Sequence, residues 1–180
     1  MNYQKNYNFR PPNFYAERSR STGTRMFTRK IVITVLIMIS LISCNRKKDI
    51  ELIHHFPNQT WNRFEKVNFS FQVEDLKPSY DIFLKIIHTD KYPYKNLRFN
   101  LIIYMPSGEE RIVEYDFDMR KEDGDFVSTA INDHFEVIFP LRSELRFTKT
   151  GICRFEFENL IPRLEIPGII TMSVVLKKTR

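Results

Sequence analysis

The chain has 180 residues, of which 42% are hydrophobic and 28% charged, and its formal net charge is +6. The positive charge is uneven: residues 1–43 hold seven of the 28 basic groups and one of the 22 acidic groups, which leaves 21 of each in residues 44–180. A neutral segment lacks the basic surface that nucleic acids and anionic membrane surfaces attract, so nucleic acid is not expected as a partner. Residues 44–180 have the length of one ordinary domain.

Residues 1–25 are rich in Asn, Tyr, Arg, Ser and Pro and show no periodic apolar pattern. A segment of this composition buries too little apolar surface to fold. We therefore expect either a disordered extension or an incorrect gene start, with translation beginning at Met26.

Residues 26–43 have the composition of a signal peptide. Arg29 and Lys30 form a basic start, and the run 31–42 contains only two polar residues, Thr34 and Ser40. A helix over this run is about 18 Å long, too short for a hydrocarbon core of about 30 Å. The pattern predicts an export signal instead of a spanning helix.

The residues that end this signal, Leu41-Ile42-Ser43-Cys44, resemble the lipobox of bacterial lipoproteins. In that class a signal peptidase cuts before the cysteine, which carries diacylglycerol on its thiol and an N-acyl chain such as palmitate. The resemblance implies that Cys44 is the lipidated first residue of the mature chain. No other cofactor is expected.

Residues 44–59 are expected to form a lipidated tether. The segment after Cys44 is polar and has no core-forming residue before Ile50. Such a segment holds a folded domain a few nanometres from the bilayer. The folded domain itself is expected over residues 60–180.

From residue 60 onward apolar residues recur at every second position, the period of a half-buried β-strand. The turn Pro106-Ser107-Gly108 between two such runs is the strongest hairpin signal. Pro140 is expected to stop a strand, and 159–167, with two prolines, to form an excursion with a helical turn. The alternating runs are 67–73, 80–90, 97–103, 113–117, 135–139, 153–157 and 170–176. They predict an all-β domain, an antiparallel β-sandwich of about seven to nine strands.

The histidines do not indicate a metal site. His54, His55, His88 and His134 show neither the i, i+2 spacing of ligands on a strand nor the i, i+4 spacing of ligands on a helix. Solvated or edge side chains are expected instead. The acidic segment 116–125 lacks the spacing of a calcium loop, so a solvated hairpin end is expected there as well.

Catalytic motifs are also missing from the sequence. It has no Gly-rich phosphate loop, no nucleophile elbow and no metalloprotease helix motif, so no enzymatic activity is expected. Cys153 lies in an alternating run, where it is expected to be a small buried hydrophobe. With Cys44 lipidated, no intrachain disulfide is expected.

Aromatic residues are abundant, with 16 Phe, 8 Tyr and 1 Trp. Most lie at core positions of the alternating runs, but Trp61, Tyr92 and Tyr94 fall in loops or at strand ends, and Pro93 stiffens its loop. Two interpretations stay open. The rings form an exposed patch for a partner, or they fold back onto the domain. Tyr92, Pro93, Tyr94 and Trp61 are therefore candidate partner-binding residues.

Four segments together resemble the GldH gliding-motility lipoproteins of the Bacteroidota. The most specific is 88–97, which is similar to N-x-D-Y-P-Y-x-N-L, although His88 and Lys91 depart from that pattern. The other three are 56–61, 106–108 and 122–125, and the resemblance covers about residues 50–180.

The resemblance implies a lipoprotein of the cell envelope, anchored in the outer membrane and facing the periplasm. It implies a non-enzymatic role in gliding motility and the linked type IX secretion machinery, through contacts with other envelope proteins. The alternative is a surface lipoprotein that binds a carbohydrate or another nutrient ligand.

Overall fold

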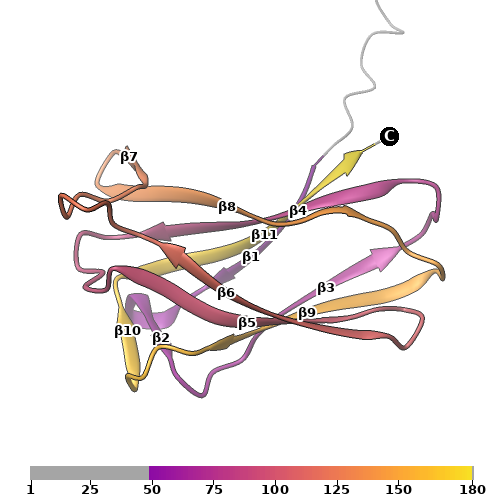
Figure 1. Ribbon diagram of the computed structural model, residues 1–180, viewed down its shortest axis with the longest axis horizontal. Helices are drawn as coiled ribbons and strands as arrows, with labels where there is room; N and C mark the ends of the chain where they lie inside the picture. The colour runs from indigo at the N-terminus through magenta and orange to yellow at the C-terminus, as the bar shows by residue number, and fades with distance from the viewer. Residues whose placement is uncertain (1–48, 180) are drawn as a thin grey trace, which may run out of the picture. The chain divides into compact units, whose positions relative to one another are not determined.

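The structure, a computed structural model, describes residues 49–179 and consists of antiparallel β-strands (Figure 1). The strands are β1 (Ile50–His55), β2 (Thr60–Asn62), β3 (Val67–Val73), β4 (Ser79–His88), β5 (Asn96–Tyr104), β6 (Glu110–Asp118), β7 (Thr129–Ile131), β8 (His134–Leu145), β9 (Gly151–Asn159), β10 (Glu165–Pro167) and β11 (Ile169–Thr179), with one 3-10 turn, η1 (Pro57–Gln59). The all-β, antiparallel prediction is confirmed. Eight strands have six residues or more, and β2, β7 and β10 have three each, too few to show a period of two in the sequence.

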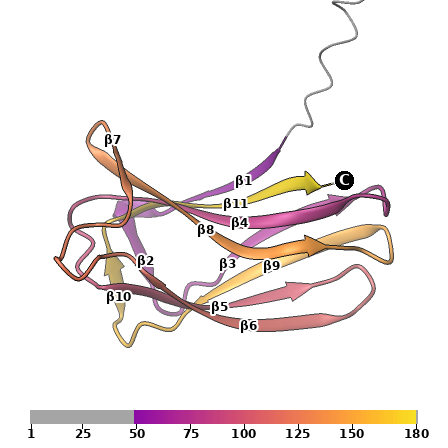
Figure 2. The ribbon, with the colours of Figure 1, turned by 45° about the horizontal axis from the view of Figure 1, so that its top comes forward.

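The strands form two main sheets and one small ribbon. The five-stranded sheet has the order β1-β11-β4-β8-β7, the four-stranded sheet has the order β3-β9-β5-β6, and β10 pairs with β2. Figures 1 and 2 show the two main sheets as separate layers. We call them the five-stranded sheet and the four-stranded sheet below.

Aromatic rings join the facing sides of the two sheets. Phe117 in β6 stacks on Phe139 in β8 with ring centroids 4.3 Å apart. At the other edge Phe71 in β3 meets Tyr80 in β4 at 5.3 Å. The alternating residues of both sheets thus contribute to one hydrophobic core.

The prediction of a tether over 44–59 is wrong from Ile50 onward. Ile50–His55 form β1, which pairs with β11 along its whole length, from Ile50 opposite Leu176 to His55 opposite Thr171. Ile50 and Leu52 pack against the core. The folded domain therefore begins at Ile50, ten residues earlier than expected.

Two expectations about proline are also wrong. Pro140 does not end its strand, because β8 continues to Leu145. Beyond Glu136 β8 has a neighbour only in β4, and a proline at a sheet edge need not remove a ladder hydrogen bond. The segment 159–167 has no helical turn and ends in β10.

Three predictions concern residues outside the described part: the extension 1–25, the signal peptide 26–43 and the lipidation of Cys44. Within residues 49–179 no helix is long and apolar enough to cross a membrane.

Candidate functional site

The long connections of the domain gather at one end, on the left of Figure 1. β4 and β6 finish there, while β5 and β8 start there. We call this end, formed by residues 89–95, 119–133 and 160–168, the loop end. β1 runs toward the loop end, so the chain enters the domain at the opposite end.

Tyr92 and Trp61 do not have the exposure that a contact residue needs. Neither ring has exposed surface. The Tyr92 hydroxyl donates to the Asn96 carbonyl at 2.8 Å, and burial raises the pKa of this phenol well above its ordinary value. The Trp61 indole N–H donates to the Glu65 carbonyl at 2.9 Å. For these two residues the exposed-patch interpretation is therefore wrong, and the interpretation in which the rings fold back onto the domain holds, because both side chains complete the core.

The neighbours of Tyr92 remain accessible. Pro93 is exposed and Tyr94 is half-buried, with its ring edge against Tyr92 at 5.8 Å. The Tyr94 hydroxyl donates to the Glu165 carbonyl at 3.3 Å. Of the four candidate residues, these two therefore keep surface that a partner can reach.

Arg120 ties the Tyr92 loop to the loop that follows β6. Its guanidinium donates to the Tyr92 carbonyl at 2.8 Å and to the Gly124 carbonyl at 2.9 Å. The same group lies 3.7 Å from the centre of the Phe126 ring, a cation–π contact. The acidic segment is thus a hairpin end held by Arg120.

Gly168 brings a third loop against the same place. Its φ is +87°, and a Cβ built on it would lie 2.5 Å from the Tyr92 backbone nitrogen. Its carbonyl accepts a hydrogen bond from the Thr89 N–H at 2.8 Å. Only glycine allows this approach of two backbones.

His88 is buried, which corrects the expectation of a solvated or edge side chain. Nδ1 lies 2.9 Å from the Thr89 carbonyl, an acceptor, so Nδ1 carries the proton and Nε2 accepts from the Ser128 hydroxyl at 2.9 Å. The ring stacks on Phe135. Burial, assisted by the nearby charge of Arg120, lowers the pKa of His88. A neutral histidine therefore fills this core position.

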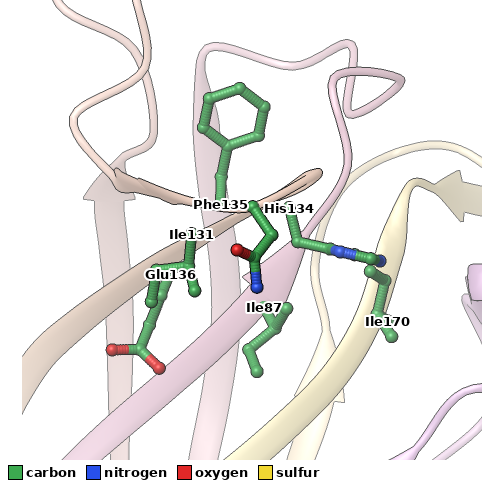
Figure 3. A pocket seen from close by; sticks show the side chains of 7 residues that line it. Ile87, Ile131, His134, Phe135, Glu136 and Ile170 are labelled. Carbon is green, nitrogen blue, oxygen red and sulfur yellow. The ribbon is translucent and has the colours of Figure 1, made fainter.

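An apolar hollow of about 330 Å³ opens beside the β7–β8 hairpin (Figure 3). It is lined by Ile87, Ile131, Asn132, His134, Phe135, Glu136 and Ile170. In Figure 3 the His134 side chain extends toward Ile170. Ile87 belongs to β4, the strand between β11 and β8. Ile131 is 46% exposed, so the hollow offers apolar surface to solvent. It is the best candidate on the loop end for contact with an apolar group.

The described residues offer little reactive chemistry. No group of three or more His, Cys, Asp or Glu side chains within 49–179 is placed to hold a metal ion. Cys153 is buried in β9, as expected, and burial raises the pKa of its thiol to about 12. A thiol with that pKa is protonated at neutral pH and is a poor nucleophile.

A family model described as GldH lipoprotein matches residues 50–174, which is more than half of the chain. The chain belongs to the GldH lipoprotein family. The matched region begins with β1 and ends inside β11, so it covers nearly the whole described domain. The resemblance seen in the sequence is confirmed.

Two curated relatives carry the GldH name. A gliding motility lipoprotein GldH homolog of Christiangramia forsetii is 26% identical over 159 residues, covering 83% of this chain and 95% of that protein. The gliding motility lipoprotein GldH of Flavobacterium johnsoniae is 24% identical over 115 residues, covering 64% of this chain and 72% of that protein.

Among solved structures, the chain has a weak likeness to a family GH115 4-O-methyl-α-glucuronidase with specificity for decorated arabinogalactans. The identity is 16%, the TM-score is 0.34, and the match covers 67% of this chain but 14% of that enzyme. A likeness at this level carries nothing over to this member of the GldH family.

The segment 88–97, the most specific part of the resemblance to GldH, has a structural role in this chain. Within it, Tyr92 fills the core, and Arg120 and Gly168, from distant parts of the sequence, both meet the Tyr92 backbone. His88 was the buried residue that we missed. It continues the core-facing series Ile82, Leu84 and Ile86, so the period of two did contain the signal.

Proposed function

We propose that this member of the GldH family is a lipid-anchored, non-enzymatic part of the gliding motility apparatus and of the secretion machinery linked to it. The observation that carries the proposal is the family match over 50–174, in a family whose curated relatives are named for gliding motility. The protein acts through contacts with other envelope proteins.

The anchor of the proposal is Cys44. Its acyl chains hold the protein in the outer membrane, and the domain faces the periplasm. Two or more chains bind a bilayer stably, whereas one chain binds it only marginally. Labelled fatty acid should enter the wild-type protein and not Cys44→Ser. Equal labelling of both would exclude Cys44 as the lipid site.

The domain serves as a rigid platform, which we classify as a β-sandwich, and the loop end is its contact surface. Loops positioned by a rigid scaffold commonly carry binding function. The hollow beside Ile131 supplies the apolar centre of the surface, and Pro93 and Tyr94 supply accessible groups on the neighbouring loop. Aliphatic and aromatic groups in such a hollow are typical anchors of protein interfaces.

The contact proposal can be tested with two matched lysine variants. Ile131→Lys places a charge in the hollow, whereas Ile138→Lys places the same charge on β8 outside it, at a side chain of similar exposure, 53% against 46%. Envelope proteins that co-purify with the tagged wild type should be lost with Ile131→Lys and retained with Ile138→Lys. Equal recovery with both variants would remove the hollow from the contact surface.

A further inference from the structure

Each main sheet ends on both sides in an edge strand, whose outer backbone groups have no neighbouring strand. Most of these edge strands carry a feature that discourages pairing with another chain. Natural proteins protect edges with short strands, charges, prolines and bulges. β7 has three residues, and the open part of β8 contains Pro140 and lies beside shifts of register. β6 carries five charged residues, and β1 has six residues with Glu51 among them.

β3 has none of these features. It is the edge strand of the four-stranded sheet and has β9 as its neighbour on one side only. Its seven residues, Val67-Asn68-Phe69-Ser70-Phe71-Gln72-Val73, include no charge, no proline and no glycine, and β3 pairs with β9 without a shift of register. Such a strand is a template for the addition of a further strand.

The sequence of β3 reads almost the same in both directions. Around Ser70 the order is Phe, amide and Val on either side, with Asn68 and Gln72 as the two amides. The apolar residues face the core, and the polar residues Asn68, Ser70 and Gln72 are exposed on the outer face. A two-fold interface requires a surface that complements itself, and a palindromic strand in antiparallel pairing has that property.

We propose that β3 pairs with β3 of a second copy of this chain, antiparallel and in register about Ser70, so that the two four-stranded sheets become one. Valine then lies opposite valine, phenylalanine opposite phenylalanine, and Asn68 of one copy opposite Gln72 of the other. Aromatic pairs and hydrogen-bonded polar pairs across strands are the pairs that stabilise sheets.

The residues that flank β3 fit the same register. Lys66 lies one position before the strand and Glu74 one position after it, so the pairing places unlike charges opposite each other at both ends. Lys66 already bridges Glu156 and Glu158 of its own chain, with Nζ 2.9 Å from Glu156, so this charge pair only supplements the match of the strand residues. Phe64 and Leu76 lie three positions outside the strand, and they are 84% and 43% exposed. The two-fold axis brings Phe64 of one copy to the same end as Leu76 of the other. The most exposed large apolar side chain among the described residues thereby gains an apolar neighbour.

The pairing also suits two anchors in one bilayer. The two-fold axis of such a pair stands normal to the joined sheet. Both five-stranded sheets therefore lie on the same face of the joined sheet. Both copies of β1, the first strand of the described residues, are in those five-stranded sheets. The inference does not depend on the proposed role in gliding.

Cysteine cross-linking in intact cells tests the register. Directly opposite residues have Cα atoms about 4.5–5.5 Å apart, within the range that a disulfide spans. Ser70→Cys should therefore form a disulfide with its own copy and give a dimer on a non-reducing gel. In Asn68→Cys the two cysteines are four positions apart, about 13 Å, and should give no dimer. Wild type is the second control, because Cys153 is buried.

Three results would overturn the pairing. The first is a Ser70→Cys chain that reacts with maleimide but forms no dimer. The second is equal cross-linking of Ser70→Cys and Asn68→Cys, which indicates random collision. The third is a disulfide between Ser70→Cys and a different envelope protein, which indicates that β3 binds another chain.

Mass measurement provides a test without cysteine. The detergent-extracted full chain should have twice the mass of one copy after correction for detergent. Ser70→Lys sets two like charges opposite each other and should halve that mass. Its unfolding transition should stay cooperative, because the Ser70 side chain is exposed. A wild type of single mass, or a Ser70→Lys variant that keeps the double mass, contradicts the proposal.

Discussion

The backbone of Gly168 lies so close to that of Tyr92 that a methyl group does not fit between them. Gly168→Ala therefore adds a steric clash to the cost of a positive φ. Gly108 has a φ of +88° with open space around it, so Gly108→Ala isolates the conformational cost, about 1–2 kcal/mol. We expect Gly168→Ala to lower the free energy of unfolding by at least about 2 kcal/mol more than Gly108→Ala does. Urea unfolding of both variants measures this difference, and equal losses would show that the approach is not tight.

Substitution of Tyr92 is expected to lower the free energy of unfolding, because its ring is buried. Truncating a buried aromatic side chain costs about 3–5 kcal/mol, so Tyr92→Ala should unfold at much lower urea or fail to accumulate. Tyr92→Phe loses only the hydrogen bond to Asn96, about 1 kcal/mol. Tyr94→Ala, at a half-buried position, should lie closer to wild type. A Tyr92→Ala variant as stable as wild type would contradict the burial of this ring.

His88 should make the stability of the domain depend on pH. Its pKa in the folded chain is below the ordinary value of 6.5, so the unfolded chain binds a proton first as the pH falls. The free energy of unfolding is then complete above about pH 6.5 and falls below it, by at most about 1.4 kcal/mol per pH unit for one group. His88→Gln does not titrate and should flatten the dependence of the urea midpoint on pH just below about pH 6.5. Parallel curves for the two proteins would exclude His88 as the source.

At the scale of elements, β3 could be predicted from the sequence, whereas β1 could not. The strict alternation of Val67–Val73 appears unchanged as the burial pattern of β3. β1 was missed because two histidines follow its few apolar residues, and its position is fixed by pairing with β11, more than a hundred residues away. The sequence also did not predict the loop end, because its contacts are long-range. The contacts of Tyr92 with Arg120 and Gly168 join segments far apart in the sequence, and no local pattern encodes them.

Removing β1 tests whether it belongs to the domain. Deletion of residues 50–55 exposes the edge of β11 and takes away Ile50 and Leu52, so the remaining chain should lose its cooperative unfolding transition. Replacing residues 45–48 with a Gly-Ser segment of equal length should leave the melting temperature unchanged. If the deletion melts like wild type, residues 50–55 are a tether after all.

At the scale of the whole molecule, the proposed protein has a lipid anchor, a two-sheet domain, and a contact surface at the end of the domain opposite to the entry of the chain. If the proposal is right, neither the anchor nor the contact surface suffices alone. A domain released from the membrane should keep its loop end but lose its place among envelope proteins. An anchored domain with a charged hollow should keep its place but lose its contacts.

The proposed role in gliding is tested most directly by the movement of single cells on a surface after the gene for this chain has been deleted from its organism. Cells without the gene should stop gliding, and the wild-type gene should restore their movement. Cys44→Ser and Ile131→Lys, produced at wild-type levels, should not restore it, whereas Ile138→Lys should. Cells that glide normally without the gene would contradict the proposed role in gliding motility.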